Sequence, residues 1–261
     1  MRSDRQLGRS GRCPDKPMSN RLNTARQSVD IRRANERFVT QAGWLDSKHS
    51  FSFGHHHDAE NINHGLLLVS NDDIIRPGTG FSTHPHRDME IVTWVLTGSL
   101  EHKDSQGNSG IIYPGLAQRM SAGTGILHSE MNPSDNESVR LVQMWVFPDT
   151  LRVKPGYEQL DINRELEKGG LVPVASGRGH DAAISIRQKG AVLWAGRIKP
   201  GEALTLPDAK SSHLFIARGA ANLEAAGRLD EGDAVRLTAA GARRMVADAQ
   251  QGAEVLVWEM N

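Results

Sequence analysis

Two short segments of the chain carry pairs of metal-binding side chains at a spacing of two residues. His84 and His86 form the first pair, and His128 and Glu130 form the second. On a β-strand, side chains two residues apart point to the same face. If the two strands face each other, three imidazoles and one carboxylate converge, and such a mixed nitrogen and oxygen donor set is typical of a metal site.

The paired arrangement is more specific than either pair alone. A single His-x-His occurs often by chance, and the simpler interpretation is two unrelated strands with solvated polar side chains. Here each pair follows a glycine-rich turn, Gly78–Gly80 before the first and Gly123–Gly125 before the second. Glycine permits the tight bends that such turns need. The pattern therefore favours one metal site built from two strands.

The surrounding sequence indicates an all-β fold. Short segments rich in β-branched and aromatic residues alternate with turn signals, which is typical of a sandwich or barrel. The segments that we predict as strands include 90–96, 99–104, 141–147, 182–187, 191–198, 213–217 and 254–259. Both halves show this rhythm, so two tandem β-barrels are the economical architecture. A short helical linker is expected within residues 149–170.

We predict three regions along the chain. Residues 1–29 are polar and Arg-rich and should form a disordered basic tail, with a nucleic-acid arm as the alternative interpretation. Residues 30–155 should form an N-terminal metal-binding domain, and residues 156–261 a C-terminal domain without metal. The second half lacks the paired pattern, so His180 and His213 should be surface or hydrogen-bonded core histidines.

Three local predictions concern segments near these strands. Residues 65–69 should be a short buried strand that ends at Asn and Asp turn residues. The run His55–His57 should be an exposed polar loop rather than a second metal site, because three adjacent side chains cannot face one point on regular backbone. Arg218 and Gly219 should form a turn.

Composition limits the classes of partner. The 261 residues have a formal net charge of zero, which gives no indication of nucleic-acid binding. The single cysteine, Cys13, excludes an internal disulfide and fits a reducing compartment. No apolar run reaches the roughly 18 residues of a membrane helix, and no signal segment is visible. We therefore expect a cytoplasmic protein that does not bind membranes, and a monomer.

The motifs resemble those of the pirin family. The resemblance rests on the segments 44–53, 84–92 and 121–130 and extends from about Ile31 to the C-terminus. It implies two cupin domains, which are jelly-roll barrels, and bacterial members of the family include quercetin 2,3-dioxygenases. Two departures from the general cupin pattern are a seventh residue before Gly98 and Gly123 in place of the usual proline.

The resemblance also implies a ligand set. It assigns the metal to His84, His86, His128 and Glu130, and it gives Glu90 a structural role. From strand parity alone Asp88 and Glu90 remain alternative carboxylates, because they share the face of His84 and His86. Three neutral imidazoles and one carboxylate suit iron, manganese, nickel, copper or zinc. The resemblance favours Fe(II).

Two functions follow from the resemblance. The first is a metal-dependent dioxygenase that opens the heterocyclic ring of flavonols such as quercetin with O2, with Glu130 as the catalytic base. The second is a non-catalytic metal- or redox-sensing module that binds a regulatory protein partner. A hydrophobic cavity of roughly 300 Å3 or more beside the metal would favour the flavonol.

Overall fold

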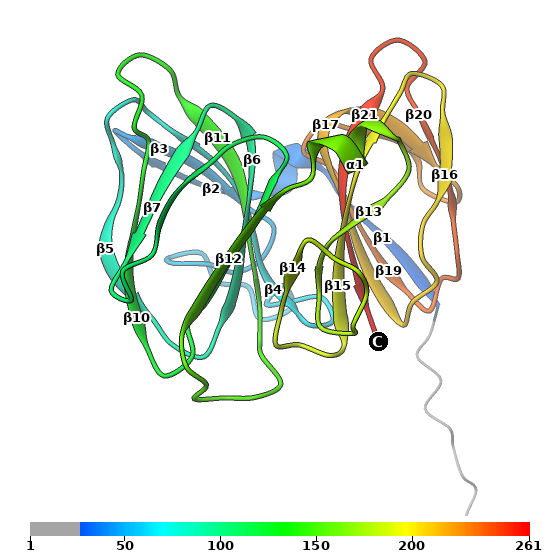
Figure 1. The fold of residues 1–261 in the computed structure, drawn as a ribbon. Helices are drawn as coiled ribbons and strands as arrows, with labels where there is room; N and C mark the ends of the chain where they lie inside the picture. The colour runs from blue at the N-terminus through cyan, green and yellow to red at the C-terminus, as the bar shows by residue number, and fades with distance from the viewer. Residues whose placement is uncertain (1–26) are drawn as a thin grey trace, which may run out of the picture.

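A computed structural model describes residues 27–261 of the chain, which form two β-barrels side by side (Figure 1). The predicted all-β architecture is confirmed. The first half contains β1 (Ser28–Arg32), η1 (Ala34–Glu36), β2 (Phe38–Ala42), β3 (Leu45–His49), β4 (Leu67–Ile75), β5 (Gly80–His86), β6 (Glu90–Thr97), β7 (Leu100–Asp104), β8 (Ser109–Ile112), β9 (Leu116–Ser121), β10 (Ile126–Met131), β11 (Val139–Val146) and β12 (Gly156–Asp161). The second contains α1 (Asn163–Glu167), β13 (Val172–Ser176), β14 (Ile184–Ser185), β15 (Ala191–Ile198), β16 (Ala203–Thr205), β17 (Ser211–Leu223), β18 (Gly227–Asp230), β19 (Ala234–Thr238), β20 (Arg244–Ala247) and β21 (Ala253–Met260).

Two sheets form the first barrel. The larger has the order β12-β9-β6-β11-β4-β3-β2, and the smaller has the order β5-β10-β7-β8. The two strands with the predicted ligand pairs, β5 and β10, are neighbours in the smaller sheet and run antiparallel, with His84 opposite His128. The topology therefore brings together two segments that lie more than 40 residues apart in the sequence.

One hydrophobic cluster joins the two barrels. Strand β6 directs Trp94 and Leu96 into a cluster that also contains Phe215 and Trp258 of the second barrel. The other face of β6, including Val95, packs inside the first barrel. Because both faces are covered, β6 is almost continuously apolar, which explains why the sequence shows a run rather than an alternation.

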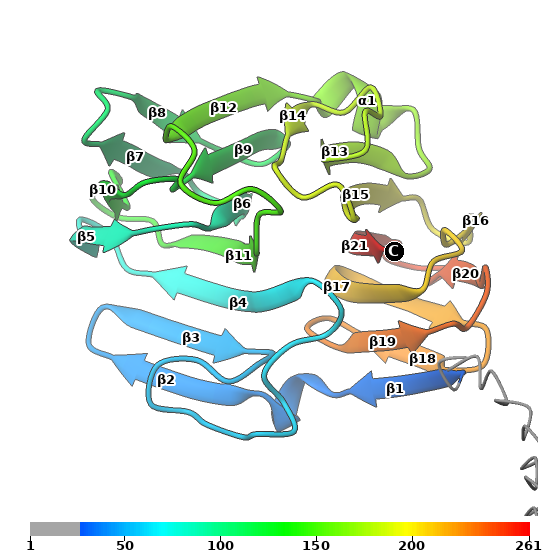
Figure 2. The ribbon, with the colours of Figure 1, turned by 90° about the horizontal axis from the view of Figure 1, so that it is seen from below.

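Two strands pair with strands on the other side of the predicted domain boundaries. Strand β1 pairs with β19 of the second barrel, and β12 pairs with β9 of the first (Figure 2). Within the predicted tail, Ser28 and Val29 already belong to β1, and residues 1–26, including Cys13, lie outside the described residues. The segment predicted as a helical linker contains the short helix α1 but also the strand β12.

Two turn predictions are wrong, and each for a local reason. Asn71, Asp72 and Asp73 lie buried inside β4, because partners from other strands satisfy their polar groups; Arg140, for example, forms an ion pair with Asp72. Arg218 and Gly219 lie inside β17, where the pairing with β21 shifts by one residue. Gly219 takes a positive φ of 70° at this bulge, which glycine tolerates.

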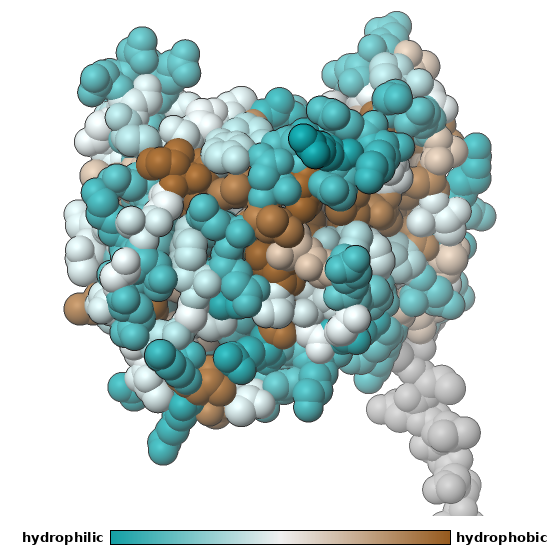
Figure 3. Space-filling model, viewed as in Figure 1, coloured by the Kyte–Doolittle hydropathy of each residue, from teal (hydrophilic) through white to brown (hydrophobic). Residues whose placement is uncertain are grey.

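The surface seen in Figure 3 is largely hydrophilic, with hydrophobic residues in a broken band across both barrels. Within residues 27–261, no helix has the length and apolar character needed to cross a membrane.

His213 of β17 is buried in the contact between the barrels, against Phe51. His213 is therefore the core histidine that we expected, but its Nε2 atom has no hydrogen-bond partner in the described part of the chain. Burial, together with the neighbouring His64 and Arg236, holds the pKa of His213 well below its ordinary value. The folded protein therefore keeps this imidazole neutral.

This buried histidine should make the metal-free protein acid-sensitive. Below about pH 6.5 the unfolded chain takes up a proton on His213 that the folded chain refuses, so this residue alone contributes a loss of roughly 1.4 kcal/mol of stability per pH unit as the pH falls. Replacing His213 by Gln should reduce the slope of stability against pH by about this amount between about pH 6.5 and 5, as measured by urea unfolding. His57→Gln, at an exposed site, should leave the slope unchanged. Equal slopes for wild type and His213→Gln would contradict the assignment.

Candidate metal centre

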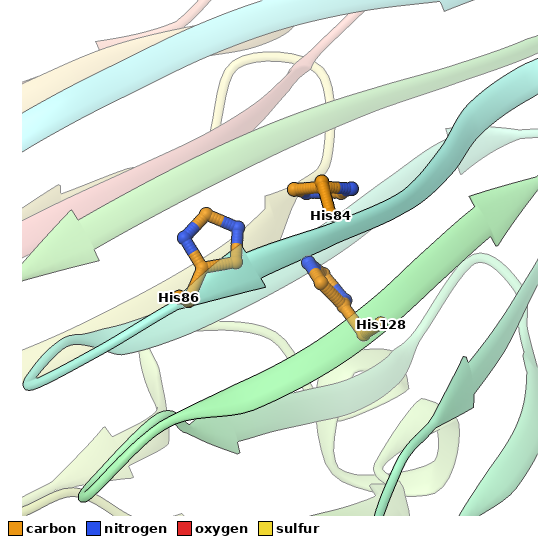
Figure 4. Close-up of side chains that lie close together, drawn as sticks. All are labelled: His84, His86 and His128. Carbon is orange, nitrogen blue, oxygen red and sulfur yellow. The ribbon is translucent and has the colours of Figure 1, made fainter.

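Three histidines converge inside the first barrel. The candidate ligand atoms of His84, His86 and His128 all lie within 4.8 Å of one another. Figure 4 shows the first two extending from β5 and the third from the neighbouring β10, with their rings turned toward a common point. The ring centroids of His84 and His128 are 4.4 Å apart. The structure thus brings together the three histidines predicted from the i, i+2 spacing.

A bulge in β5 prepares His84 for ligation. The pairing of β5 with β10 shifts between His128 and Glu130, and bulges of this kind commonly redirect side chains at functional sites. The carbonyl of Ser82 in this bulge lies 2.8 Å from Nδ1 of His84. A carbonyl only accepts hydrogen bonds, so Nδ1 carries the proton and Nε2 keeps its lone pair for a metal.

Close approach of the two ligand strands depends on a glycine. A Cβ atom added at Gly80, the first residue of β5, would lie 2.2 Å from the carbonyl oxygen of Glu130 and 2.7 Å from Cα of Met131. Both contacts are with the backbone of β10, which cannot yield cheaply. A side chain here would push β5 away from β10 and separate the histidines.

His128 shows the clearest sign of a missing partner. It is 2% exposed, and its Nε2 atom has no hydrogen-bond partner among the described residues. A buried, unpaired polar atom is costly unless something binds it. Burial, with the adjacent His84 and His86, lowers the pKa of His128 to about 2, and burial lowers that of His86 to about 4. Neutral imidazoles are the form that binds metals, so these residues fit an ion.

Glu130 lies one step deeper in the barrel. Its carboxylate belongs to a group with His102 and His128 whose candidate ligand atoms lie within 4.8 Å, and it is not part of the group with His84 and His86. The side-chain amide of Gln143 donates to it at 2.7 Å. Burial raises the pKa of Glu130 above its ordinary value. Glu130 remains the predicted fourth ligand, next to His128.

The two alternative carboxylates point elsewhere. Glu90 accepts hydrogen bonds from the Ser121 hydroxyl at 2.9 Å and from the backbone N–H of Arg187 at 3.1 Å, so it ties the first barrel to the second. Asp88 accepts from the backbone N–H of Arg152 at 2.6 Å. Both are committed to structural contacts, which supports the structural role expected for Glu90.

A third polar pair near the centre was missed by the sequence reasoning. His102 and Asp104 lie on β7, the strand next to β10, and Nδ1 of His102 is 3.5 Å from Nδ1 of His128. The signal was present, because these residues show the same i, i+2 spacing within a segment that we predicted to be a strand.

A cavity of about 240 Å3 opens beside the histidines. Its apolar wall is formed by Leu45, Phe53, Phe81 and Trp145. Its polar floor includes Asp73, whose pKa burial raises to about 7 and to which the Ser47 hydroxyl donates a hydrogen bond. The sequence does not indicate Asp73 as a site residue, because Asn and Asp favour turns.

The histidine run at 55–57 divides among different environments. His55 and His57 are exposed, as predicted for a polar loop, but His55 also lines the cavity. His56 is half-buried, because a bridge between Phe53 and His56 folds the loop back. There the His56 ring stacks on Phe38 with centroids 5.1 Å apart. Within residues 27–261, both groups of potential metal ligands lie in the first barrel.

Comparison with known proteins places these features in a family. Residues 31–146 match the family model described as Pirin, and residues 173–260 match that of a Quercetinase C-terminal cupin domain. These matches confirm the predicted two tandem cupin domains.

Curated relatives and solved structures agree with this. The chain is 57% identical over 235 residues to a Mycobacterium bovis protein named "Putative quercetin 2,3-dioxygenase", covering 90% of this chain and 96% of the relative. It is 51% identical over 131 residues to the quercetin 2,3-dioxygenase of Escherichia coli K12, covering 50% of this chain and 57% of that protein. The crystal structure of the bacterial pirin YhhW from E. coli in complex with nickel(II) superimposes with a TM-score of 0.82 at 34% identity, covering 89% and 99% of the two chains.

Removal of one central histidine should sharply lower the metal content of the protein. His86→Ala should lower the metal content of the purified protein by more than about tenfold, because changes even in outer-shell partners typically cost 10–100-fold in affinity. His56→Ala, which removes a histidine from the adjacent loop, should retain the wild-type content by plasma mass spectrometry. Equal losses in the two variants would show that the site lies elsewhere.

The choice between the two glutamates can be tested with isosteric changes. Glu130→Gln should weaken metal binding by roughly tenfold or more, since an amide oxygen is a poorer ligand than a carboxylate. Glu90→Gln should bind metal as wild type does in isothermal titration. The reverse ranking of the two dissociation constants would make Glu90 the ligand.

Proposed function

This chain belongs to the pirin family, and on that premise we propose that it is a metal-dependent dioxygenase that opens the heterocyclic ring of flavonols such as quercetin with O2. The observation that carries the proposal is the group of three converging histidines beside a largely apolar cavity. The names of its relatives, "Putative quercetin 2,3-dioxygenase" in M. bovis and "Quercetin 2,3-dioxygenase" in E. coli, support the same substrate class.

In the proposed enzyme, His84, His86, His128 and Glu130 hold one divalent ion. Fe(II) suits oxygen chemistry, and Ni(II) is also a candidate because this donor set suits it and the similar pirin YhhW forms a complex with nickel(II). When bound, the ion supplies positive charge that stabilises the enolate of a hydroxy-ketone, and it offers coordination positions that the four side chains leave open. Because the three imidazoles are neutral, only the carboxylate of Glu130 offsets the charge of the ion, and part of its positive charge remains.

The cavity determines how much of the substrate can be enclosed. Its volume of about 240 Å3 is below the roughly 300 Å3 at the lower end for pockets that bury a drug-sized ligand. We therefore place only the hydroxy-ketone edge of the flavonol inside. Phe53, Phe81 and Trp145 offer aromatic faces and edges to the flat ring system, and they exclude water from the reacting atoms.

The reaction requires the 3-hydroxyl proton to leave before the ring opens. Glu130 is the proposed base, because its buried carboxylate lies on the cavity wall and Gln143 fixes its orientation. Both atoms of O2 enter the ring-opened ester product. The ring carbon that carried the hydroxyl leaves as CO, so no further reductant is needed.

The small cavity also favours, as a second candidate, a metal- or redox-sensing module that binds a regulatory protein. In that case metal binding would change the surface that contacts the regulatory protein, and no substrate would be consumed.

Turnover distinguishes the two functions. The Fe(II)-loaded protein should convert quercetin in air to the ring-opened depside and CO, as followed by the loss of flavonol absorbance, and should leave it intact without O2. Luteolin, which differs from quercetin by lacking the 3-hydroxyl, should not react. Absence of turnover with each of Fe, Mn, Ni, Cu and Zn would contradict the enzymatic function and favour the sensing module.

A further inference from the structure

A chain of three buried groups runs from the metal centre toward the β7–β8 turn. The side chains of His102 and Asp104 on β7 are both 0% exposed. In the pairing of β10 with β7, His128 lies opposite Asp104, and Glu130 lies opposite His102. The smaller sheet therefore presents three neighbouring strands, β5, β10 and β7, that each direct an i, i+2 polar pair into the barrel.

The hydrogen bonds along this chain fix the position of each proton. Nε2 of His102 lies 3.3 Å from Oδ2 of Asp104, and because a carboxylate only accepts, His102 carries its proton on Nε2. Its Nδ1 must then accept from Nδ1 of His128, which lies 3.5 Å away, at the outer limit of hydrogen bonding. His128 is left with a lone pair on Nε2, the atom that lacks a partner.

Hydrogen bonds hold Asp104 in place, so that it can fix the positions of the protons on His102 and His128. Its Oδ1 accepts from the backbone N–H groups of Gln106 and Asn108 at 2.8 and 3.1 Å. Burial alone would raise the pKa of Asp104, but the hydrogen bonds from Asn108, His102 and Gln106 together outweigh burial and lower the pKa, so the carboxylate is charged. Tyr157 of β12 stacks on His102, with centroids 4.7 Å apart and planes 28° from parallel, and fixes the plane of the ring.

We propose that Asp104 and His102 are positioning residues, which set the tautomer of His128 and hold its Nε2 lone pair toward the metal. Outer-shell carboxylates commonly fix ligating histidines in this way, and here a second histidine relays the effect. The proposal rests on the metal binding in the proposed function, but it does not depend on substrate turnover.

His102 could instead be a ligand, because its group with His128 and Glu130 would hold an ion of its own. The geometry argues against this, since both ring nitrogens of His102 already face partners, His128 and Asp104. The two assignments predict different metal counts for the chain.

Asp104→Asn is the decisive variant. Its amide oxygen can still accept from the β7–β8 turn, so its amide N–H would donate to Nε2 of His102. The proton of His102 would then move to Nδ1, where it would face the N–H of His128. Two donors cannot form a hydrogen bond with each other, so the proton of His128 would move from Nδ1 to Nε2. Affinity for Co(II) or Ni(II) by isothermal titration should fall by roughly 10–100-fold. In metal-free protein, the 15N imidazole signals of His128 should show the proton moved from Nδ1 to Nε2.

Two further variants control for packing. Glu101→Gln makes the same carboxylate-to-amide change on the same strand, at a residue whose carboxylate pairs with the exposed Lys103, and should bind metal as wild type does. His102→Gln keeps an acceptor for His128 and a donor for Asp104, and its affinity should stay within about threefold of wild type. Circular dichroism of each metal-free variant checks the fold.

Three results would overturn the proposal. The first is an Asp104→Asn dissociation constant equal to that of Glu101→Gln, and the second is an unchanged proton position on His128. The third is two ions bound per wild-type chain, with one lost in His102→Gln, which would make His102 a ligand. If wild type binds no metal, the proposed function fails, but the 15N signals of the metal-free protein still decide the inference.

Discussion

The centre depends on one constraint: an imidazole that binds a metal must keep the lone pair of one nitrogen free while its other nitrogen carries the proton. In water, solvent accepts a hydrogen bond from the protonated nitrogen, but inside a barrel that N–H group needs a specific acceptor from the protein. His84 uses the carbonyl of Ser82 in the β5 bulge, at 2.8 Å. His128 uses the buried His102, which in turn relies on Asp104. The lone pairs that remain, on Nε2 of His84 and Nε2 of His128, are therefore free to bind one metal ion.

The rest of the fold serves this arrangement. The antiparallel pairing of β5 and β10 sets His84 opposite His128, and Gly80 allows the two backbones to approach. The larger sheet closes the barrel and supplies Gln143, which orients Glu130. Its outer face packs on the second barrel through the hydrophobic cluster that contains Trp94 and Trp258. The second barrel thus buries one face of the sheet whose other face lines the site.

Features that depend on local periodicity, such as the face of a strand on which a side chain lies, could be predicted from the sequence. Features that depend on tertiary partners, such as buried polar residues and long-range strand pairing, could not. The i, i+2 spacing of His84 and His86 was sufficient to place both on one strand face, and resemblance selected Glu130 over Glu90. Asp73 was missed because Asn and Asp favour turns in isolation, whereas here Ser47 and a neighbouring strand accommodate it inside β4. The bulge in β5 has no evident local signal. Local periodicity does not identify β12 as a strand, because its pairing with β9 is long-range.

The most direct test is the anomalous diffraction of a crystal loaded with one divalent metal. We expect a single strong peak per chain in the first barrel, within bonding distance of Nε2 of His84 and His128, of a ring nitrogen of His86 and of the Glu130 carboxylate. Nδ1 of His128 should remain directed at His102. A peak bound through Nδ1 of His128, or a peak outside this barrel, would contradict this expectation.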